Sequence, residues 1–258
     1  MPIHPQLIQD LNKSRIIKVI SGCLNNFEEA EIIEVVKAAE LGKATYIDIA
    51  ADAKIISLAS QHTELPLCIS SIILDQIFAC IDNGIKIVEI GNFDAFYSNS
   101  MYFNINDIKN ISLKVRKQYP NITICTTLPY ILSLKEQSEL AKYLENIGID
   151  LLQTEGTINN KNINKYNNIP LKKSHSTLLT TYNLSKMVDI PIIAASGISQ
   201  NNAKTAISYG AKGIGIKTAI CKTVGLKNKI KLIQSIKTDL STQFEHQEEV
   251  VPAHFLQK

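Results

Sequence analysis

Short apolar runs recur along the chain, and polar or amphipathic segments separate them. Each run has the length and the content of β-branched residues that are typical of a strand buried on both faces. The predicted strands are Ile16–Ser21, Tyr46–Ala50, Leu67–Ile72, Ile87–Gly91, Ile122–Leu128, Leu151–Thr154, Ile190–Ser196 and Gly213–Lys217. Helix signals follow several of them, including N-caps at Asp52 and Ser199 and a capping box from Ser133 to Glu136. Strands that alternate with helices predict a parallel sheet.

Eight such units predict an α/β fold in which the sheet closes into a single (β/α)8 barrel. The length of 258 residues is close to the ~250 residues that are typical of this fold. The alternative is an open, doubly wound sheet, which normally has a G-x-G-x-x-G turn after its first strand, whereas Gly22 stands alone here. We therefore expect one domain over residues 1–258. It has a short N-terminal helix at Pro5–Lys13, a barrel over about 15–240 and a polar tail over 241–258.

Charged residues interrupt several of the apolar runs. Lys18, Asp48 and Glu89 each lie between two apolar neighbours in a predicted strand, and Glu155 follows Gln153 at the end of the sixth. Because neighbouring residues of a strand face opposite sides, these side chains point away from the helices and into the barrel. An unpaired charge facing the helices would be costly to bury. The pattern therefore predicts a charged cluster inside the barrel.

This cluster has two interpretations. One is a catalytic set of Lys18, Asp48, Glu89 and Glu155, in which burial lowers the pKa of the lysine and raises those of the carboxylates. Such shifts suit acid–base or imine chemistry. The other is a structural layer of ion pairs between Lys18 and Asp48 or Glu89. The sequence leaves both open.

The last two predicted strands end in small residues, in Ala195-Ser196-Gly197 and in Gly215-Ile216-Lys217-Thr218. In a (β/α)8 barrel, the loops after strands seven and eight are a frequent phosphate site, where backbone N–H groups and a helix N-terminus face the anion. The candidate phosphate ligands are Ser196, Gly197, Gly215, Lys217 and Thr218. Alternatively, Gly197 only makes a tight turn and Gly215 only relieves crowding in the barrel. Lys217 is unusual here, because its side chain either fills the site or supplies charge to it.

Composition narrows the range of partners. The net charge is +3 and the lysines are scattered, which argues against a nucleic-acid partner. No apolar run has the length of a membrane span, so no membrane partner is expected. The five cysteines form no C-x-x-C pair, which favours a reducing compartment. No histidine ends a predicted strand, and only His175 is near the expected site, so no histidine-based metal site is predicted. Asp48, Glu89 and Glu155 are the ligand type that Mg²⁺ prefers, but carboxylates on separate strands are weak evidence, so no metal is predicted. Two long connections follow strands on the same face: residues 92–105, rich in aromatic residues, and residues 156–175, rich in Asn and Lys.

Several sequence blocks resemble the family called hypothetical chloroplast open reading frame twenty-three. The blocks are Lys18-Val19-Ile20-Ser21-Gly22, Leu24-Asn25-Asn26-Phe27, Asp48-Ile49-Ala50-Ala51-Asp52, Glu89-Ile90-Gly91-Asn92-Phe93-Asp94, Gln153-Thr154-Glu155-Gly156 and Ala195-Ser196-Gly197. The resemblance covers about residues 15–220 and implies a TIM-type barrel in a plastid or a cyanobacterium-like cell. It implies no particular activity. The abundance of Ile, Asn and Lys fits an AT-rich organelle genome, so we expect a plastid-encoded protein of the chloroplast stroma.

The leading functional hypothesis is a barrel that binds a small phosphorylated metabolite and acts on it as an isomerase, epimerase or lyase. A looser similarity links the chain to phosphate-binding barrels such as thiazole synthase and the ribulose-phosphate epimerase group. Flavin mononucleotide is a cofactor that the same phosphate site would accept. The competing hypothesis is a non-catalytic binding or scaffold barrel, because a fold alone does not decide activity.

Overall fold

The protein is described by a computed structural model, which covers residues 3–21, 28–91, 93, 102–156 and 173–242. Eight parallel strands form a closed barrel in sequence order, with β1 paired to β8. The predicted (β/α)8 architecture is therefore confirmed. The strands are β1 (Ile16–Ile20), β2 (Tyr46–Ala50), β3 (Leu67–Ser71), β4 (Ile87–Ile90), β5 (Thr123–Leu128), β6 (Leu151–Thr154), β7 (Ile192–Ala194) and β8 (Gly213–Ile216).

Strand β7 is shorter than the apolar run that predicts it. Pro191 accepts a hydrogen bond from the Leu152 N–H through its carbonyl oxygen but has no N–H to donate to a neighbouring strand, so β7 begins only at Ile192. At the other end, Ser196 and Gly197 both have φ of +74°, which turns the chain out of the sheet. The predicted strand over Ile190–Ser196 is therefore trimmed at both ends.

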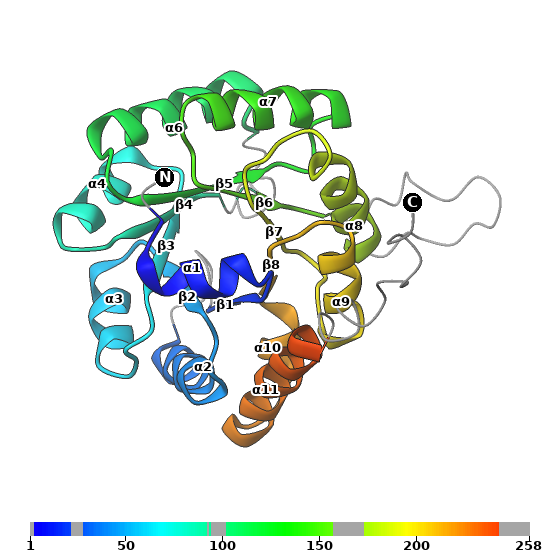
Figure 1. The fold of residues 1–258 in the computed structure, drawn as a ribbon. Helices are drawn as coiled ribbons and strands as arrows, with labels where there is room; N and C mark the ends of the chain where they lie inside the picture. The colour runs from blue at the N-terminus through cyan, green and yellow to red at the C-terminus, as the bar shows by residue number, and fades with distance from the viewer. Residues whose placement is uncertain (1–2, 22–27, 92, 94–101, 157–172, 243–258) are drawn as a thin grey trace, which may run out of the picture.

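Helices surround the barrel, as Figure 1 shows. They are α1 (Pro5–Asn12), α2 (Glu29–Gly42), α3 (Ala53–Ser60), α4 (Leu74–Asp82), α6 (Ile105–Gln118), α7 (Leu134–Asn146), α8 (Lys173–Leu184), α9 (Gln200–Ser208), α10 (Thr218–Lys222) and α11 (Leu226–Thr242). The predicted caps at Asp52 and Ser199 and the box from Ser133 to Glu136 are confirmed. None of the helices among the described residues is long and apolar enough to cross a bilayer.

Helix α6 is not predicted by the apolar pattern, because most of its residues are polar. Its start does carry a local signal: Asn104 and Asp107 form a reciprocal capping box. Helix α11 continues to Thr242, beyond the predicted start of the polar tail at residue 241. The remainder of that tail, most of the aromatic connection at 92–105 and most of the connection at 156–175 lie outside the described residues.

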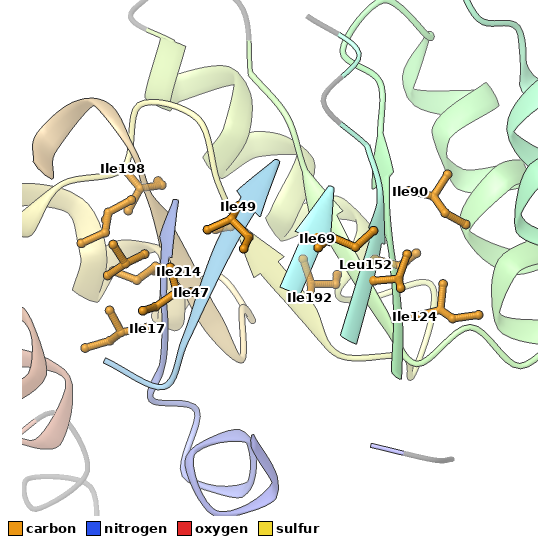
Figure 2. Close-up of a cluster of buried hydrophobic side chains, with 14 of the residues drawn as sticks. Ile17, Ile47, Ile49, Ile69, Ile90, Ile124, Leu152, Ile192, Ile198 and Ile214 are labelled. Atoms are coloured by element: carbon orange, nitrogen blue, oxygen red, sulfur yellow. The ribbon is translucent and has the colours of Figure 1, made fainter. Parts of the chain in front are cut away.

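The outward-facing residues of the strands pack against the surrounding helices. Figure 2 shows part of this layer, in which Ile17, Ile47, Ile69, Ile124 and Ile214 are all fully buried or nearly so. This apolar shell accounts for the Ile-rich composition of the runs. Burying such side chains is the main stabilising contribution to the fold, at about 25 cal/mol per Å² of apolar surface.

The inward-facing residues near the amino ends of the strands form a second apolar cluster. We call it the lower layer, and its members are Ile16, Tyr46, Cys68, Ile87, Cys125, Leu151 and Ile193. Helix α1 lies across this end of the barrel in Figure 1, and its Leu7 and Leu11 belong to the same cluster. The amino end of the barrel is therefore filled by side chains and covered by the N-terminal helix.

Candidate active site

A second inward-facing layer, most of it polar, lies two residues further along the chain from each member of the lower layer or from Gly213 of β8. Because strand side chains alternate, these residues also face the barrel interior, closer to the carboxyl ends. We call them the upper layer: Lys18, Asp48, Ser70, Glu89, Thr127, Gln153, Ala195 and Gly215. The charged residues that interrupt the apolar runs thus meet inside the barrel.

Lys18 is the centre of this layer, and its side chain is fully buried. Its Nζ lies 2.9 Å from Asp48 Oδ2, and it also forms an ion pair with Glu89 Oε2. It donates a hydrogen bond to Gln153 Oε1 at 2.9 Å. One ammonium group therefore ties together strands β1, β2, β4 and β6.

The other polar groups of the layer hold the two carboxylates in place. Glu89 Oε1 accepts hydrogen bonds from Thr127 Oγ1 at 2.9 Å and from Gln153 Nε2 at 2.8 Å. Asp48 Oδ1 accepts a hydrogen bond from Ser70 Oγ at 2.6 Å. These contacts fix both carboxylates and also fix which way the Gln153 amide is turned.

The buried charges of this cluster shift the pKa values of Lys18 and Glu89. Burial acts to lower the pKa of Lys18, but Asp48 and Glu89 outweigh it and raise this pKa well above its usual value. Burial also raises the pKa of Glu89, which Lys18 opposes and Asp48 reinforces. The expectation of a lowered lysine pKa is therefore wrong, because two carboxylates compensate for the loss of water. Lys18 is an ammonium ion at neutral pH.

A cavity of about 80 Å³ lies above the upper layer, at the carboxyl ends of the strands. This volume is larger than the ~30 Å³ that one water molecule occupies in the liquid. The three predicted carboxylates Asp48, Glu89 and Glu155 all line it. Lys18 does not, because its own partners cover it. The predicted phosphate residues also line this cavity: Ser196, Gly197, Gly215, Lys217 and Thr218.

The turn after β7 is held from behind by helices α8 and α9. Thr177 Oγ1 donates to the carbonyl oxygens of Ala195 at 2.9 Å and Ser196 at 2.7 Å. Asn202 Nδ2 donates to the carbonyl oxygen of Gly197 at 3.1 Å. Among the described residues, no hydrogen bond uses the amide N–H of Gly197 or Ile198. The carbonyl oxygens of the turn therefore accept hydrogen bonds from within the protein, whereas two backbone N–H groups at the cavity wall donate none within the part of the chain that the structure describes.

Gly197 meets two separate requirements of this turn. Its φ of +74° is in the left-handed region that favours glycine. A Cβ at this position would also lie 2.7 Å from the backbone nitrogen of Ser174, at the start of α8. The turn and helix α8 therefore approach more closely than any other residue type allows.

The β8 side of the cavity is lined by backbone and by exposed polar side chains. A Cβ on Gly215 would point into the barrel, 3.0 Å from Ala195 Cβ and 3.6 Å from Gln153 Oε1. Lys217 and Thr218 are exposed, and Lys217 precedes the short helix α10. The exposed lysine therefore lies at the mouth of the cavity, while Gly215 leaves its interior open.

Glu155 lies on the wall of the cavity, apart from the Lys18 cluster. It is buried, and its Oε2 accepts a hydrogen bond from the backbone N–H of Tyr130 at 3.1 Å.

Lys173, the first residue of α8, also lines the cavity, and the sequence pattern does not predict its role. Its only sequence signal is that it lies in the long Asn- and Lys-rich connection at 156–175 on this face of the barrel. His175 is exposed, and no group of three or more potential metal ligands occurs among the described residues.

Comparison with known proteins identifies the family. Residues 3–246 match the model of a family described as "Protein of unknown function (DUF561)". A relative from Porphyra purpurea, "Uncharacterized protein ycf23", is 37% identical over 252 residues, which are 97% of this chain and 94% of the relative. The chain belongs to the ycf23 family. A ycf23 protein of Cyanophora paradoxa is 36% identical and covers 90% of this chain and 95% of its own.

This membership confirms the resemblance that the sequence blocks indicate. The ycf23 relatives come from plastid genomes, including that of Pyropia yezoensis, whose protein is 39% identical over 92% of this chain and 87% of its own. The chain is accordingly a plastid-encoded chloroplast protein.

Solved structures with the same fold include enzymes of low sequence identity. Deoxyribose phosphate aldolase from Aeropyrum pernix has a TM-score of 0.61 and 15% identity, covering 90% of this chain and 97% of its own. Thiamine phosphate pyrophosphorylase from Pyrococcus furiosus has a TM-score of 0.58 and 18% identity, with coverages of 90% and 98%. (S)-3-O-geranylgeranylglyceryl phosphate synthase from Thermoplasma acidophilum, in complex with sn-glycerol-1-phosphate, has a TM-score of 0.60 and 13% identity, with coverages of 93% and 100%. At these identities the similarity shows the fold alone.

Proposed function

We propose that the protein binds a small phosphorylated metabolite in the cavity above the upper layer. The phosphate lies against the turn after β7 and the end of β8. The observation that carries this proposal is the turn itself, in which Thr177 and Asn202 occupy the carbonyl oxygens. The unbonded N–H donors of Gly197 and Ile198 are left at the cavity wall. Consecutive backbone N–H groups of this kind are suited to an anion.

The charge of the cavity and the names of proteins with the same fold support the same ligand class. Lys173 and Lys217 line the cavity, so positive charge lies near the proposed phosphate position. Thr218 offers a hydroxyl on the same side. The names of several proteins with this fold contain phosphorylated compounds, including deoxyribose phosphate, thiamine phosphate and glyceryl phosphate. Together these features favour a phosphate monoester over an uncharged ligand.

For the chemistry, we propose acid–base catalysis by the carboxylates of the cavity wall, as in an isomerase, epimerase or lyase. Asp48, Glu89 and Glu155 are buried and line the cavity, so each is placed to exchange a proton with a bound ligand. Glu155 is the preferred proton acceptor, because it lies on the cavity wall outside the Lys18 cluster to which Glu89 belongs.

The position and charge of Lys18 favour acid–base chemistry over an imine mechanism. An imine forms from a free amine, whereas the raised pKa of Lys18 keeps it protonated. Lys18 also lies beneath the cavity lining rather than within it. We therefore assign Lys18 the role of positioning Asp48, Glu89 and Gln153.

The test is calorimetric titration of the purified protein with inorganic phosphate and with sugar phosphates. We expect binding by the wild type and at least a tenfold loss in Gly197→Ala, because the added Cβ displaces the turn from α8. Gly148→Ala is the matched control: Gly148 has φ of +80° and open space around its Cβ position, far from the cavity lining. Both variants carry similar backbone strain, so only the first loses the ligand. A folded wild type that binds none of these compounds contradicts the proposal.

A non-catalytic scaffold barrel, which binds no small molecule, is the second candidate. It is favoured by the complete burial of Lys18 and by the pairing of its charge inside the protein. Mass spectrometry of small molecules that copurify with the protein distinguishes the two, because a scaffold retains no phosphorylated metabolite. Flavin mononucleotide carries the same phosphate group and is included as a probe. A purified protein that stays colourless after incubation with this flavin argues against that cofactor.

A further inference from the structure

Helix α7 has one residue on its buried face that the helical pattern of apolar residues does not explain. Residues at spacings of three and four form this face, and they are Gln137, Leu140, Ala141 and Leu144. Three of the four are apolar, whereas Gln137 has a polar amide and is only 4% exposed. An amide is costly to bury unless it forms hydrogen bonds. The explanation for a glutamine here therefore lies in the bonds that it makes.

The hydrogen bonds of Gln137 hold the turn after β5, residues 129–132. Its Nε2 donates to the carbonyl oxygens of Pro129 and Leu132, both at 3.1 Å. The same turn is closed by a hydrogen bond from the Leu132 N–H to the Pro129 carbonyl oxygen at 3.2 Å. One side chain of α7 thus connects both ends of the turn to the helix.

This turn directs a backbone N–H to the cavity wall. The N–H of Tyr130 donates to Glu155 Oε2 at 3.1 Å, and Glu155 is buried and lines the cavity. A hydrogen bond from a backbone N–H favours the ionised form of a carboxyl group, and the ionised form is the one that accepts a proton. The turn after β5 therefore holds Glu155 in the place and the form that the proposed chemistry needs.

The turn after β7 is built in the same way. There, Thr177 of α8 donates to the carbonyl oxygens of Ala195 and Ser196, and the N–H groups that follow lie at the cavity wall. In both turns, a buried side chain of a helix binds carbonyl oxygens and leaves backbone N–H groups for an acceptor at the cavity. The acceptor is the proposed phosphate in one turn and Glu155 in the other.

We infer that Gln137 is a positioning residue for Glu155 and acts through the turn after β5. Gln137 itself does not line the cavity. The inference rests on the proposed function and deepens it, because it states how the proton acceptor of that site is held. A purely structural role has a different consequence: an apolar side chain of similar length would replace Gln137 without any effect on proton transfer.

The experiment compares Gln137→Met with Glu136→Ala in the full chain. Methionine keeps the length of the side chain and suits the apolar face, but it donates no hydrogen bond to the turn. Glu136→Ala is the matched control on the preceding residue, because it removes the capping bonds to Ser133 and leaves those of Gln137 in place.

Proton transfer is measured in D2O with dihydroxyacetone phosphate and ribulose 5-phosphate as probes. Glu155 takes a proton from the carbon beside the carbonyl group, exchanges it with solvent and returns a deuteron, so deuterium replaces hydrogen on that carbon. Calorimetry measures the affinity for the same probes. We expect exchange to be ~10- to 100-fold slower in Gln137→Met, with affinity within about twofold of wild type, because the acceptor is displaced while the phosphate turn is not. Glu136→Ala should match the wild type in both measurements.

The outcomes separate this inference from the proposed function. Exchange at the wild-type rate in Gln137→Met overturns the inference and leaves the proposed function intact. If the wild type binds the probes but exchanges no hydrogen, the proposed acid–base chemistry fails and the inference fails with it. If the wild type binds no phosphate ester, the proposed function itself fails.

Hydrogen exchange of the Tyr130 amide, followed by NMR, tests the positioning step by itself. We expect this amide to lose at least tenfold protection in Gln137→Met and none in Glu136→Ala. A Tyr130 amide that stays fully protected in Gln137→Met overturns the inference. If Gln137→Met does not fold, Gln137→Asn replaces it. Its shorter amide does not reach both carbonyl oxygens, so smaller losses in the same direction are expected, and wild-type behaviour overturns the inference.

Discussion

The lower and upper layers of the barrel interior come from the same strands, two residues apart, yet they have opposite character. In the lower layer, Ile16 and Tyr46 belong to the same apolar cluster as Leu7 of α1. In the upper layer, Lys18 and Asp48 form an ion pair beneath a cavity. The strand geometry is shared, so side-chain chemistry alone decides which end is filled and which end is available to a ligand.

The two layers contribute differently to the stability of the barrel. The lower layer is apolar and sealed by a helix, so its burial is favourable without any partner requirement. The upper layer buries charge, which is favourable only while every partner is in place. Substitutions in each layer separate these two contributions.

Lys18→Met is expected to have the largest effect. It removes the one cation of the cluster and leaves Asp48 and Glu89 buried together, which costs about 3–5 kcal/mol of unfolding free energy. Denaturant titration measures the loss. The triple variant Lys18→Met, Asp48→Asn, Glu89→Gln is the control, because it removes all three charges and should recover most of that loss.

The loss of stability in Lys18→Met is expected to depend on pH. The folded pKa of Glu89 is raised, so folding favours its protonated form, and stability falls as pH rises from the unfolded carboxyl pKa through the folded value. Removing Lys18 takes away the group that opposes this rise. The stability loss in Lys18→Met should therefore be smaller at pH 5 than at pH 8. A loss that is independent of pH contradicts the assignment of charge to this cluster.

Leu7→Ala tests the lower layer alone. Leu7 is fully buried where α1 covers the barrel, and its truncation should cost about 2–5 kcal/mol by leaving a cavity. Ligand affinity should be unchanged, because the upper layer lies between this cavity and the site. Denaturant titration measures the stability and calorimetry measures the ligand affinity of the same preparation. A parallel loss of affinity would show that the two layers are coupled.

Gly213→Ala and Gly215→Ala form a matched pair on β8. A Cβ on Gly213 would lie 2.4 Å from Ile16 Cβ in the lower layer, so we expect destabilisation of about 1–3 kcal/mol. A Cβ on Gly215 meets less crowding, 3.0 Å from Ala195 Cβ, but enters the cavity. Gly213→Ala should lower the free energy of unfolding with little effect on ligand affinity. Gly215→Ala should weaken ligand binding with little effect on the free energy of unfolding. If both variants changed stability and ligand affinity to the same extent, the distinction between the two layers would be wrong.

Thr177→Val should have the smallest effect on stability, about 1 kcal/mol. It keeps the shape of the side chain but removes the donor to the carbonyl oxygens of Ala195 and Ser196. We expect weaker phosphate binding with an intact fold, measured by calorimetry. Thr181→Val on the same helix is the control, since its hydroxyl pairs with Thr154 behind the sheet rather than with the turn.

The barrel could be predicted from sequence because its signals are local. The apolar runs set the strands, and the caps at Asp52, Ser133 and Ser199 set three helix starts. The inward position of Lys18 followed from alternation with Ile17 and Val19. The start of α6 was also available in the Asn104–Asp107 box, although the apolar pattern does not mark this polar helix.

The candidate site was less predictable, because its properties depend on groups far apart in the chain. The pKa direction of Lys18 depends on how closely Asp48 and Glu89 approach it, which no sequence pattern gives. Thr177 and Lys173 reach the site only through the fold of helix α8. Glycine at 197 was visible in the sequence, but its close approach to Ser174 was not.

The strands that supply the ion cluster have a consequence for how the protein folds. Lys18, Asp48 and Glu89 come from β1, β2 and β4, so the cation and both anions are present in the first four strands. The proposed phosphate turn belongs to the last two units. During synthesis the charged core of the barrel is thus translated well before the strand that closes it. Pulse-labelled hydrogen exchange should detect early protection in β1 to β4, with the ligand site formed only when β8 reaches β1.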